Sequence, residues 1–521
     1  MIAKPIVLQL FIFIFFIGIS EAQERVISAN KSLISLSAIK GTTSRCDTLI
    51  LFSNRDYNIR DIKIAGTHAS YFRLTNKSFS KISVGKPAKI ALVFEPPSNF
   101  TGIAEAFVKI NSNTLTIPLY GLSTQGLEGE NEAPLAQVVE ALGLKINLGW
   151  TTLANHLRPE LQGEELTPSL FVKADTGTVV MIPVARYSPD FPLNFGYYTQ
   201  GNHGPVQHQA GILAAAGNIP EHQTLYPALA EGATSFDPGD KQFGFYATSP
   251  GHTLYSEDIW NMLFYPTHAT HAIRIYPVRD NTGKTIPNTY LVGMEEAANG
   301  DYNDYVFLVK NIKPVNLSEK FTSLFNGENL NGWYTWLEGK GKNNDPEGNF
   351  TVANGEIADT GKTLGYIMSE KAYGNYHFTL DFKWGQKRWP PRDNAKRDSG
   401  ICYNVPAEES DKIWPQSIEC QIQEGDVGDF WLIGYSTIQV DKKQNAPQRY
   451  SQIVKKKDAE KPTGEWNTVE VISFNGKCVH IVNGVIVNFG ENASLIGGKI
   501  LLQSEYAEVY YRNVKIRELG L

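Results

Sequence analysis

The chain has 521 residues, 48 basic and 54 acidic residues, a net charge of −6, and a hydrophobic fraction of 42%. This length predicts about three domains, and the hydrophobic content excludes a wholly disordered chain. No stretch concentrates Lys and Arg, so the composition disfavours a nucleic-acid partner.

The first 22 residues have the pattern of a secretory signal. Lys4 precedes an apolar run at residues 6–18, and the small residue Ala22 precedes the expected cleavage point. The alternative is a membrane anchor, but the run is shorter than the ~20 residues that span a bilayer. We therefore expect an exported protein, periplasmic, cell-surface or extracellular, with no membrane span in the mature chain.

Residues 25–124 alternate short β-rich runs with turn clusters, a rhythm that predicts a β-sandwich. The segments LVFEPP at 92–97, INSN at 110–113 and IPLYG at 117–121 resemble the Ig-like choice-of-anchor modules of bacterial surface proteins. The resemblance implies an Ig-like module that spaces or docks, with a partner at the cell surface. A polar linker is expected at residues 125–133.

Residues 134–315 begin with a short amphipathic helix and continue as a second β-rich domain. This region holds seven of the ten histidines, but their spacing matches no zinc-site pattern. Glycan or calcium binding is the expected role of this domain.

The acidic turn in this region contains Asp301, Asn303 and Asp304. Oxygens of these side chains can converge on a calcium ion, although the EF-hand pattern is not met. The alternative is a turn that satisfies its own backbone through Asp and Asn side chains. Segments at 271–277, 288–290, 301–307 and 311–314 resemble an exported domain of unknown function similar to calcium-associated, sugar-facing β-sandwiches. No other cofactor is predicted.

Four cysteines, Cys46, Cys402, Cys420 and Cys478, match neither a zinc ribbon nor a disulfide framework. Two interpretations stay open: buried free thiols, or one bridge between Cys402 and Cys420.

Residues 319–521 are predicted to be all β. Asn475-Gly476 and Asn483-Gly484 lie between β-rich runs, and Asn-Gly is a strong hairpin signal because both residues accept a positive φ. About 200 residues of alternating strands predict a two-sheet jelly roll. The expected fold is thus all-β throughout: an Ig-like sandwich, a second sandwich with short helices, and a C-terminal jelly roll.

Strand alternation predicts a polar face on this third domain. In residues 417–423, apolar side chains alternate with polar ones, so Glu419 and Gln421 are expected to share one face. His480 is placed opposite its apolar neighbours, and Gln503 and Glu505 project together. Paired donors and acceptors of this kind suit sugar hydroxyls. Stacking planes are expected from Trp384, Trp389, Trp414 and Trp431.

Six ordered segments of this domain resemble the 3-keto-disaccharide hydrolase family. They are FNGENLNGW at 325–333, KWGQKRWPPRDNAKRDSGICYNV at 383–405, WPQSIECQIQEGDVGDFWLIG at 414–434, EWNTVEV at 465–471, VHIVNGVIVN at 479–488 and GKILLQSEYAEVYYRNVKIREL at 498–519. The resemblance implies a concanavalin-like jelly roll that cleaves glycosides oxidised at C3.

Cleavage of a 3-keto-glycoside by elimination needs a base for the acidified C2 proton, a group that stabilises the enolate oxygen, and an acid for the leaving group. We expect Glu419 to be the base and His480 or Glu505 the proton donor. Arg397 or a divalent cation is expected at the oxyanion. Substrate contacts are expected from Trp384, Asp398, Gln421, Glu424, Asp426, Trp431 and Gln503.

Two other functions compete with this one. A non-catalytic lectin can share the fold, because fold does not determine function. A conventional glycosidase needs two carboxylates ~5–10 Å apart across the scissile bond. In each case the partner is an oligosaccharide or glycoside.

Overall fold

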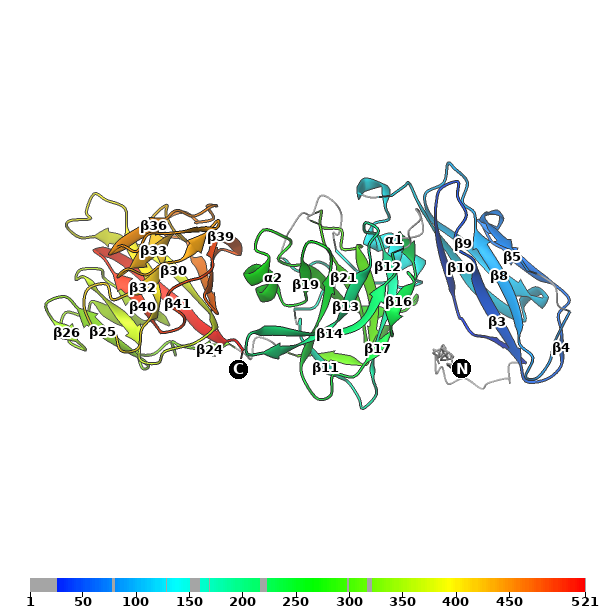
Figure 1. Ribbon diagram of the computed structural model, residues 1–521, viewed down its shortest axis with the longest axis horizontal. Coiled ribbons are helices and arrows are strands. Elements are labelled where there is room, and N and C mark those ends of the chain that lie inside the picture. Colours follow the sequence, from blue (N-terminus) through cyan, green and yellow to red (C-terminus); the bar gives the residue numbers. More distant parts are fainter. Residues whose placement is uncertain are drawn as a thin grey trace, which may run out of the picture.

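The structure is a computed structural model that describes residues 26–76, 80–127, 129–149, 160–167, 169–215, 223–297, 299–315 and 321–520. The expected signal at residues 1–22 lies outside these ranges. Strands dominate, so the all-β prediction is confirmed, and three β units follow one another along the long axis (Figure 1). No helix in the described ranges combines the length and apolar character needed to cross a bilayer.

The first unit is a sandwich of two four-stranded sheets, ordered β1-β3-β8-β6 and β2-β10-β9-β5. Alternate residues such as Leu49, Ile90 and Leu119 are fully buried and form one core between the sheets. The strands are β1 (Ile27–Ala29), β2 (Ile34–Ile39), β3 (Asp47–Ser53), β5 (Ile62–Ala65), β6 (Phe72–Leu74), β8 (Ala88–Phe94), β9 (Gly102–Ile110) and β10 (Leu115–Thr124), with β4 (Tyr57–Asn58) paired to β7 (Lys81–Ile82).

The middle unit also stacks two sheets, ordered β16-β14-β13-β18-β11-β23 and β15-β12-β22-β21-β20. Helix α1 (Leu135–Ala141) precedes them and packs with Leu122 of the first unit and Val306 of the middle one. The strands are β11 (Phe171–Lys173), β12 (Val179–Arg186), β13 (Leu193–Gly201), β14 (Gly204–Leu213), β15 (Thr224–Leu225), β16 (Leu229–Gly232), β17 (Ser235–Phe236), β18 (Phe243–Thr248), β19 (Thr253–Tyr255), β20 (Ile273–Arg279), β21 (Thr285–Met294), β22 (Tyr305–Lys310) and β23 (Ile312–Pro314).

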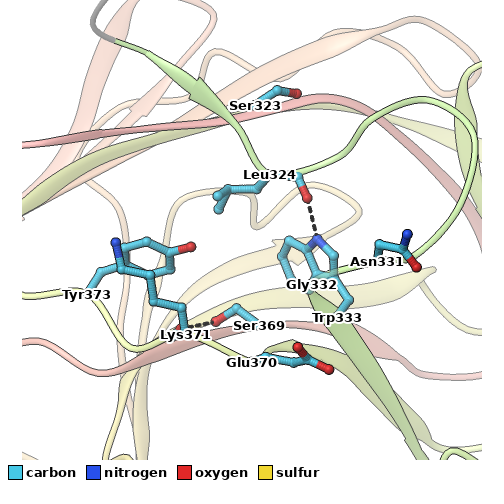
Figure 2. A pocket seen from close by; sticks show the side chains of 9 residues that line it. All are labelled: Ser323, Leu324, Asn331, Gly332, Trp333, Ser369, Glu370, Lys371 and Tyr373. Atoms are coloured by element: carbon cyan, nitrogen blue, oxygen red, sulfur yellow. Dashed lines mark hydrogen bonds between the residues drawn. The ribbon is translucent and has the colours of Figure 1, made fainter.

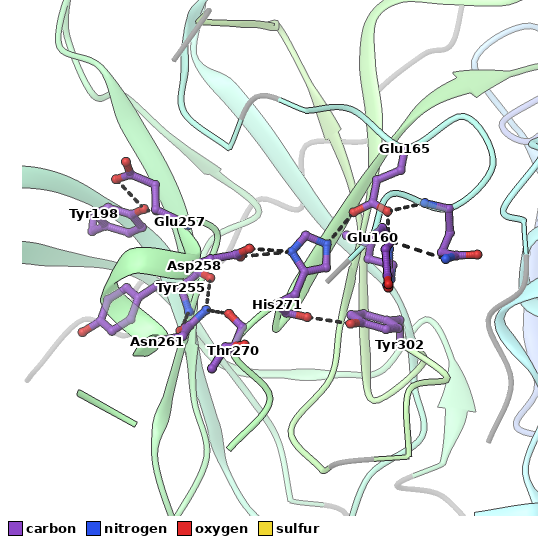
Figure 3. Close-up of polar contacts among 12 residues, drawn as sticks. Glu160, Glu165, Tyr198, Tyr255, Glu257, Asp258, Asn261, Thr270, His271 and Tyr302 are labelled. Atoms are coloured by element: carbon purple, nitrogen blue, oxygen red, sulfur yellow. Dashed lines mark hydrogen bonds and ion pairs between the residues drawn. The ribbon is translucent and has the colours of Figure 1, made fainter. Parts of the chain in front are cut away.

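A largely buried ion network lies inside the middle unit, with Asp258 at its more exposed end (Figure 3). His271 donates from Nδ1 to Asp258 at 2.9 Å and from Nε2 to Glu165 at 2.7 Å, and Arg274 also pairs with Glu165. Burial opposes a charge on the ring, but the two carboxylates outweigh it and raise the pKa of His271 to about 10. The imidazole is therefore a cation at neutral pH.

The third unit has two eight-stranded sheets that enclose one large core, and a two-stranded sheet in which β34 (Gln439–Val440) pairs with β35 (Lys443–Gln444). One sheet, which packs against the middle unit and is called the junction sheet, has the order β27-β28-β41-β30-β37-β38-β39, with β24 paired to β41. The other, called the distal sheet, has the order β26-β25-β29-β40-β31-β32-β33-β36. The strands are β24 (Thr322–Ser323), β25 (Trp333–Leu337), β26 (Gly341–Lys342), β27 (Phe350–Ala353), β28 (Glu356–Asp359), β29 (Gly365–Ser369), β30 (Tyr376–Arg388), β31 (Asp398–Val405), β32 (Ser417–Gln423), β33 (Phe430–Ile433), β36 (Tyr450–Ile453), β37 (Asn467–Phe474), β38 (Lys477–Val482), β39 (Val485–Gly490), β40 (Lys499–Ser504) and β41 (Ala507–Glu518).

The two Asn-Gly pairs form the hairpins that the sequence predicts. Asn475 and Gly476 have φ of 47° and 78° and join β37 to β38. Asn483 and Gly484, at 50° and 79°, join β38 to β39. Positive φ at both central residues matches the twist of the flanking strands.

The middle and third units share a buried junction. Helix α2 (Asp258–Phe264) carries Trp260, whose ring meets Phe474 edge-on at 5.3 Å between centroids. Beside it, Arg517 and Glu257 form a 2.6 Å ion pair with side chains only 7% and 2% exposed. The junction therefore buries an ion pair as well as aromatic contacts.

All four cysteines are free thiols, so of the two interpretations the free thiols are confirmed and the alternative Cys402–Cys420 bridge is wrong. Cys420 points into the core between the sheets, whereas Cys402 lies in the apolar cluster on the other face of the distal sheet. Cys402 and Cys478 are buried as expected, but Cys46 is exposed.

Candidate active site

The outer face of the distal sheet carries the polar surface that strand alternation predicts. In β32, Ile418, Cys420 and Ile422 lie in the core between the sheets. Glu419 and Gln421 therefore project from the opposite face, since successive strand residues point to opposite sides. Both side chains are nearly buried, at 4% and 5% exposure.

A glycine makes room for the central carboxyl group. Gly400 of β31 pairs with Gln421, and a Cβ atom at Gly400 would overlap Glu419 Oε1 and Gln503 Oε1. The carboxyl group of Glu419 and the amide oxygen of Gln503 thus both lie over Gly400. Burial, and then the nearby charge of Asp398, raise the pKa of Glu419 well above its ordinary value.

Two further carboxyl groups lie beside this centre. Burial and the charge of Asp398 raise the pKa of Glu505 well above its ordinary value, and burial also raises the pKa of Asp398. Arg392 Nη2 contacts Asp398 and lies 3.3 Å from Glu505 Oε2. Gln423 Nε2 donates to Asp398 Oδ2 at 2.7 Å. Two close carboxyls share protons, so Glu505 is the group that retains one as the pH rises.

Several buried polar atoms of this cluster have no hydrogen-bond partner among the described residues. They include Asp398 Oδ1, Gln421 Oε1, Gln503 Oε1 and Trp431 Nε1. Buried polar groups are nearly always paired in folded proteins, so such a concentration indicates a site whose partners come from a ligand or water. Three acceptors and one donor match the mixed demands of sugar hydroxyls.

Aromatic side chains border the cluster. Trp431 of β33 pairs in register with Glu419. The rings of Trp336 and Tyr366 stack at 5.5 Å on the same face, and Trp414 packs against this group. Flat rings beside polar groups provide surfaces on which sugar rings stack.

The structure does not place His480 with these residues, so its predicted position on the Glu419 face is wrong. Its ring lies in the core between the sheets, where Nε2 accepts from Tyr403 Oη at 3.0 Å and Nδ1 donates to the Gly428 carbonyl at 2.9 Å. Burial lowers the pKa of His480 to about 3. Both faces of β38 are buried, because Val479 and Ile481 pack at the junction with the middle unit.

Trp384 also lies apart from the site. Its side chain is 2% exposed within the core between the sheets and meets Phe382 at 5.7 Å. Trp384 lies on the same face of β30 as Leu380 and Phe382, and this face points into the core. Trp389, from the adjoining loop, donates its indole N–H to the Thr360 carbonyl at 2.9 Å.

Arg397 is occupied by other partners. Its Nη1 pairs with Glu424 Oε1 at 3.1 Å, and its Nε donates to the Gly385 carbonyl. Asp426 pairs with Lys396 at 2.6 Å, on the exposed turn. The cation beside the carboxyl cluster is instead Arg392, which the sequence reasoning missed because it lies in an irregular loop after Pro390-Pro391.

A separate cavity of about 230 Å³ opens at another edge of the third unit (Figure 2). Trp333 Nε1 donates to the Leu324 carbonyl at its wall at 2.6 Å. None of the carboxyl cluster lines it. Its lining residues are Ser323, Leu324, Asn331, Gly332, Trp333, Ser369, Glu370, Lys371 and Tyr373.

The acidic turn of the middle unit is buried and lies in a different unit from the carboxyl cluster. Asp301, Asn303 and Asp304 are 3%, 0% and 4% exposed. Asn303 donates to the Ala133 carbonyl at 2.7 Å, and Asp304 Oδ2 accepts from the Glu296 N–H at 2.6 Å. Across the described ranges, no three His, Cys, Asp or Glu side chains are grouped as a metal centre.

Comparison with protein families gives one match. The model of the 3-keto-alpha-glucoside-1,2-lyase-like domain matches residues 320–517, which span the third unit. Among curated proteins, nothing matches.

Solved structures that are similar to part of this chain include carbohydrate-active proteins. One, from Parabacteroides distasonis ATCC 8503 and assigned as a glycosyl hydrolase, is 23% identical, with 39% of this chain and 95% of that chain covered and a TM-score of 0.29. A Bacillus licheniformis β-glucanase is 13% identical, with 38% and 96% covered and a TM-score of 0.26. The carbohydrate-binding module CBM66 of Bacillus subtilis is 10% identical, with 36% and 96% covered and a TM-score of 0.24.

Proposed function

We propose that the third unit is an exported enzyme domain that cleaves glycosides oxidised at C3, by elimination followed by hydration. The observation that carries the proposal is the buried Glu419 carboxyl over Gly400, flanked by the Asp398–Glu505 pair and Arg392. The family match over residues 320–517 supports the same substrate class.

In the first step, Glu419 removes the C2 proton of the bound sugar. The C3 carbonyl makes this proton acidic, and its oxygen becomes an enolate as the C2–H bond breaks. A base works best when its pKa lies near the working pH, and burial shifts Glu419 in that direction. Arg392, in place of the expected Arg397, is the cation beside the cluster that suits the enolate charge.

In the second step, the enolate re-forms the carbonyl, a C1=C2 double bond forms, and the C1–O bond to the leaving group breaks. Glu505 is the proton donor to that oxygen, because it holds its proton to a higher pH than an ordinary glutamate. Water then adds to C1 and a proton returns to C2. The net reaction consumes one water and requires no oxidant or reductant.

The aromatic border and the unpartnered amide oxygens provide the binding part of the site. Trp431 offers a stacking surface next to Glu419, and Gln421 and Gln503 offer acceptors to sugar hydroxyls. The first unit is proposed to dock the enzyme at the cell surface. Its sandwich precedes the middle unit and is joined to it through α1.

The test is cleavage of a 3-keto-glucoside compared with its unoxidised parent, using the full chain with and without chelator. We expect cleavage of the oxidised sugar alone, and loss of turnover by at least 10³-fold in Glu419→Gln with unchanged thermal unfolding. Glu328→Gln, at an exposed loop position of the same unit, is the matched control and should retain full turnover.

The competing functions give different results in the same assay. Binding of either sugar without turnover indicates a lectin. Cleavage of the unoxidised parent indicates a two-carboxylate glycosidase. Either result rejects the elimination mechanism.

A further inference from the structure

The connection between β21 and β22 in the middle unit folds around a buried carboxyl group. Glu295 Oε2 accepts from the backbone N–H of Gly300 at 2.9 Å and of Tyr302 at 3.2 Å. Asp301 lies between these two donors in the chain, and Asn299 donates to Asp301 Oδ2 at 3.0 Å. The side chains of the turn are therefore held close to Glu295.

This turn contains four oxygen acceptors without a partner in the described part of the chain. They are Glu295 Oε1, Asn299 Oδ1, Asp301 Oδ1 and Asn303 Oδ1. Each atom is buried, and the side chains of Glu295 and Asn303 are 0% exposed. Buried acceptors are nearly always paired in folded proteins, so four unpaired ones within a few residues indicate a site whose partner is a ligand.

Negative side chains gather around Asp304 of this turn. The side-chain charges that act on Asp304 are those of Glu295, Asp301 and Glu296, all negative. A cation would neutralise this repulsion and give the unpaired oxygens a partner at the same time.

We propose that the turn binds Ca²⁺ through Glu295, Asn299, Asp301 and Asn303, in a site distinct from the carbohydrate-active unit. All four donors are oxygens and two are amides, a mixture that suits calcium, which takes 6–8 oxygen ligands. Only two of the four ligands are carboxylates, so the proposed site differs from a metal centre built on three or more His, Cys, Asp or Glu side chains, of which the described ranges contain none. Backbone carbonyls and water would complete the coordination.

The ion would strengthen the link between the first two units. Asn303 donates its amide to the Ala133 carbonyl at 2.7 Å, just before α1. Tyr302, in the same turn, donates to the His271 carbonyl at 2.6 Å and covers Arg274 at 4.5 Å. Calcium at this turn thus fixes residues that hold both α1 and the His271 network.

The experiment uses the full chain, stripped with chelator and titrated with CaCl₂ or MgCl₂ by calorimetry and thermal unfolding. We expect Ca²⁺ to bind and to raise the unfolding temperature of the middle unit, with a much weaker response to Mg²⁺. Asp301→Asn and Glu295→Gln should lose the calcium shift. Asp280→Asn, at an exposed turn of the same unit, should keep it.

Misfolding of the variants is distinguished by their stability without calcium. Removing one charge from a repelling cluster should leave the stripped Asp301→Asn variant at least as stable as stripped wild type. The proposal is overturned by the absence of calcium binding, by an equal response to Mg²⁺, or by an unchanged calcium shift in both variants. A shift that disappears only in Asp398→Asn would place the ion in the third unit and overturn it as well.

Discussion

Replacement of Gly400 by alanine tests the geometry of the carboxyl cluster. A Cβ atom at this position would overlap both Glu419 Oε1 and Gln503 Oε1, so these side chains must move. Overpacking of this kind costs about 1–3 kcal/mol. A displacement of ~1 Å at a reacting group is enough for a ~10²-fold loss of rate. We therefore expect Gly400→Ala to lower both the stability of the third unit and the turnover of a 3-keto-glucoside.

Gly374→Ala is the matched control, because Gly374 has no atom within 4 Å of an added Cβ and no left-handed φ. Urea unfolding and steady-state kinetics should leave this control within experimental error of wild type. Adding Glu419→Ala to Gly400→Ala removes one overlapping oxygen, so the double variant should be less destabilised than the sum of the single changes. Wild-type stability and turnover in Gly400→Ala would refute the proposed crowding of Glu419.

Three further predictions concern groups outside the carboxyl cluster. His480→Ala should lower the free energy of unfolding by about 1–3 kcal/mol, because it leaves the Tyr403 hydroxyl unpaired. The pH dependence of kcat should not change. Loss of the acidic or the basic limb of the pH–rate profile would contradict this prediction. Because the pKa of His271 is raised, its ion pairs stabilise the middle unit fully below pH ~6.5, and this stability is lost as the pH rises towards about 10. His271→Gln should therefore flatten the dependence of the unfolding temperature on pH between pH 6 and 10. An unchanged pH dependence would refute the assignment. Arg517→Met leaves Glu257 buried without its cation, so it should lower the free energy of unfolding by about 3–5 kcal/mol. The middle and third units should then unfold separately in calorimetry. A single unshifted transition would contradict a stabilising ion pair.

Strand alternation located the central part of the site from sequence. The alternation of β32 correctly assigned Ile418, Cys420 and Ile422 to the core and Glu419 to the other face. The two Asn-Gly hairpins were also predictable, since their φ values follow from local steric preference. Both signals depend only on neighbouring residues, which is why they transfer directly to the structure.

The same signal fails where both faces of a strand are buried. In β38, Val479 and Ile481 pack at the junction between units, and His480 points into the core between the sheets. Alternation along a strand separates its two faces but does not show which face is exposed. The contact that buries Val479 and Ile481 comes from α2, which is distant in the sequence, so local alternation does not reveal it. Trp384 is a different case: it shares the inward-facing positions of β30 with Leu380 and Phe382, so alternation along that strand places it in the core.

Residues in loops were harder to place than residues in strands. Arg392 contacts Asp398 and Glu505 from a loop without periodicity, whereas the nearby Arg397 pairs with Glu424. Two arginines five positions apart carry the same charge, and only the tertiary path of the loop distinguishes them. The sequence alone therefore does not show which of the two arginines lies beside the predicted carboxyls.

The most direct test of the central proposal is the fate of the C2 proton during cleavage. The full chain is incubated with a 3-keto-glucoside in D₂O, and the released sugar is analysed by mass spectrometry and NMR, with an enzyme-free sample correcting for spontaneous exchange. Elimination followed by hydration predicts one deuterium at C2 in each product molecule, and none of this product with Glu419→Gln. Product that retains its original hydrogen at C2, together with the absence of a primary kinetic isotope effect for substrate deuterated at C2, would contradict the mechanism.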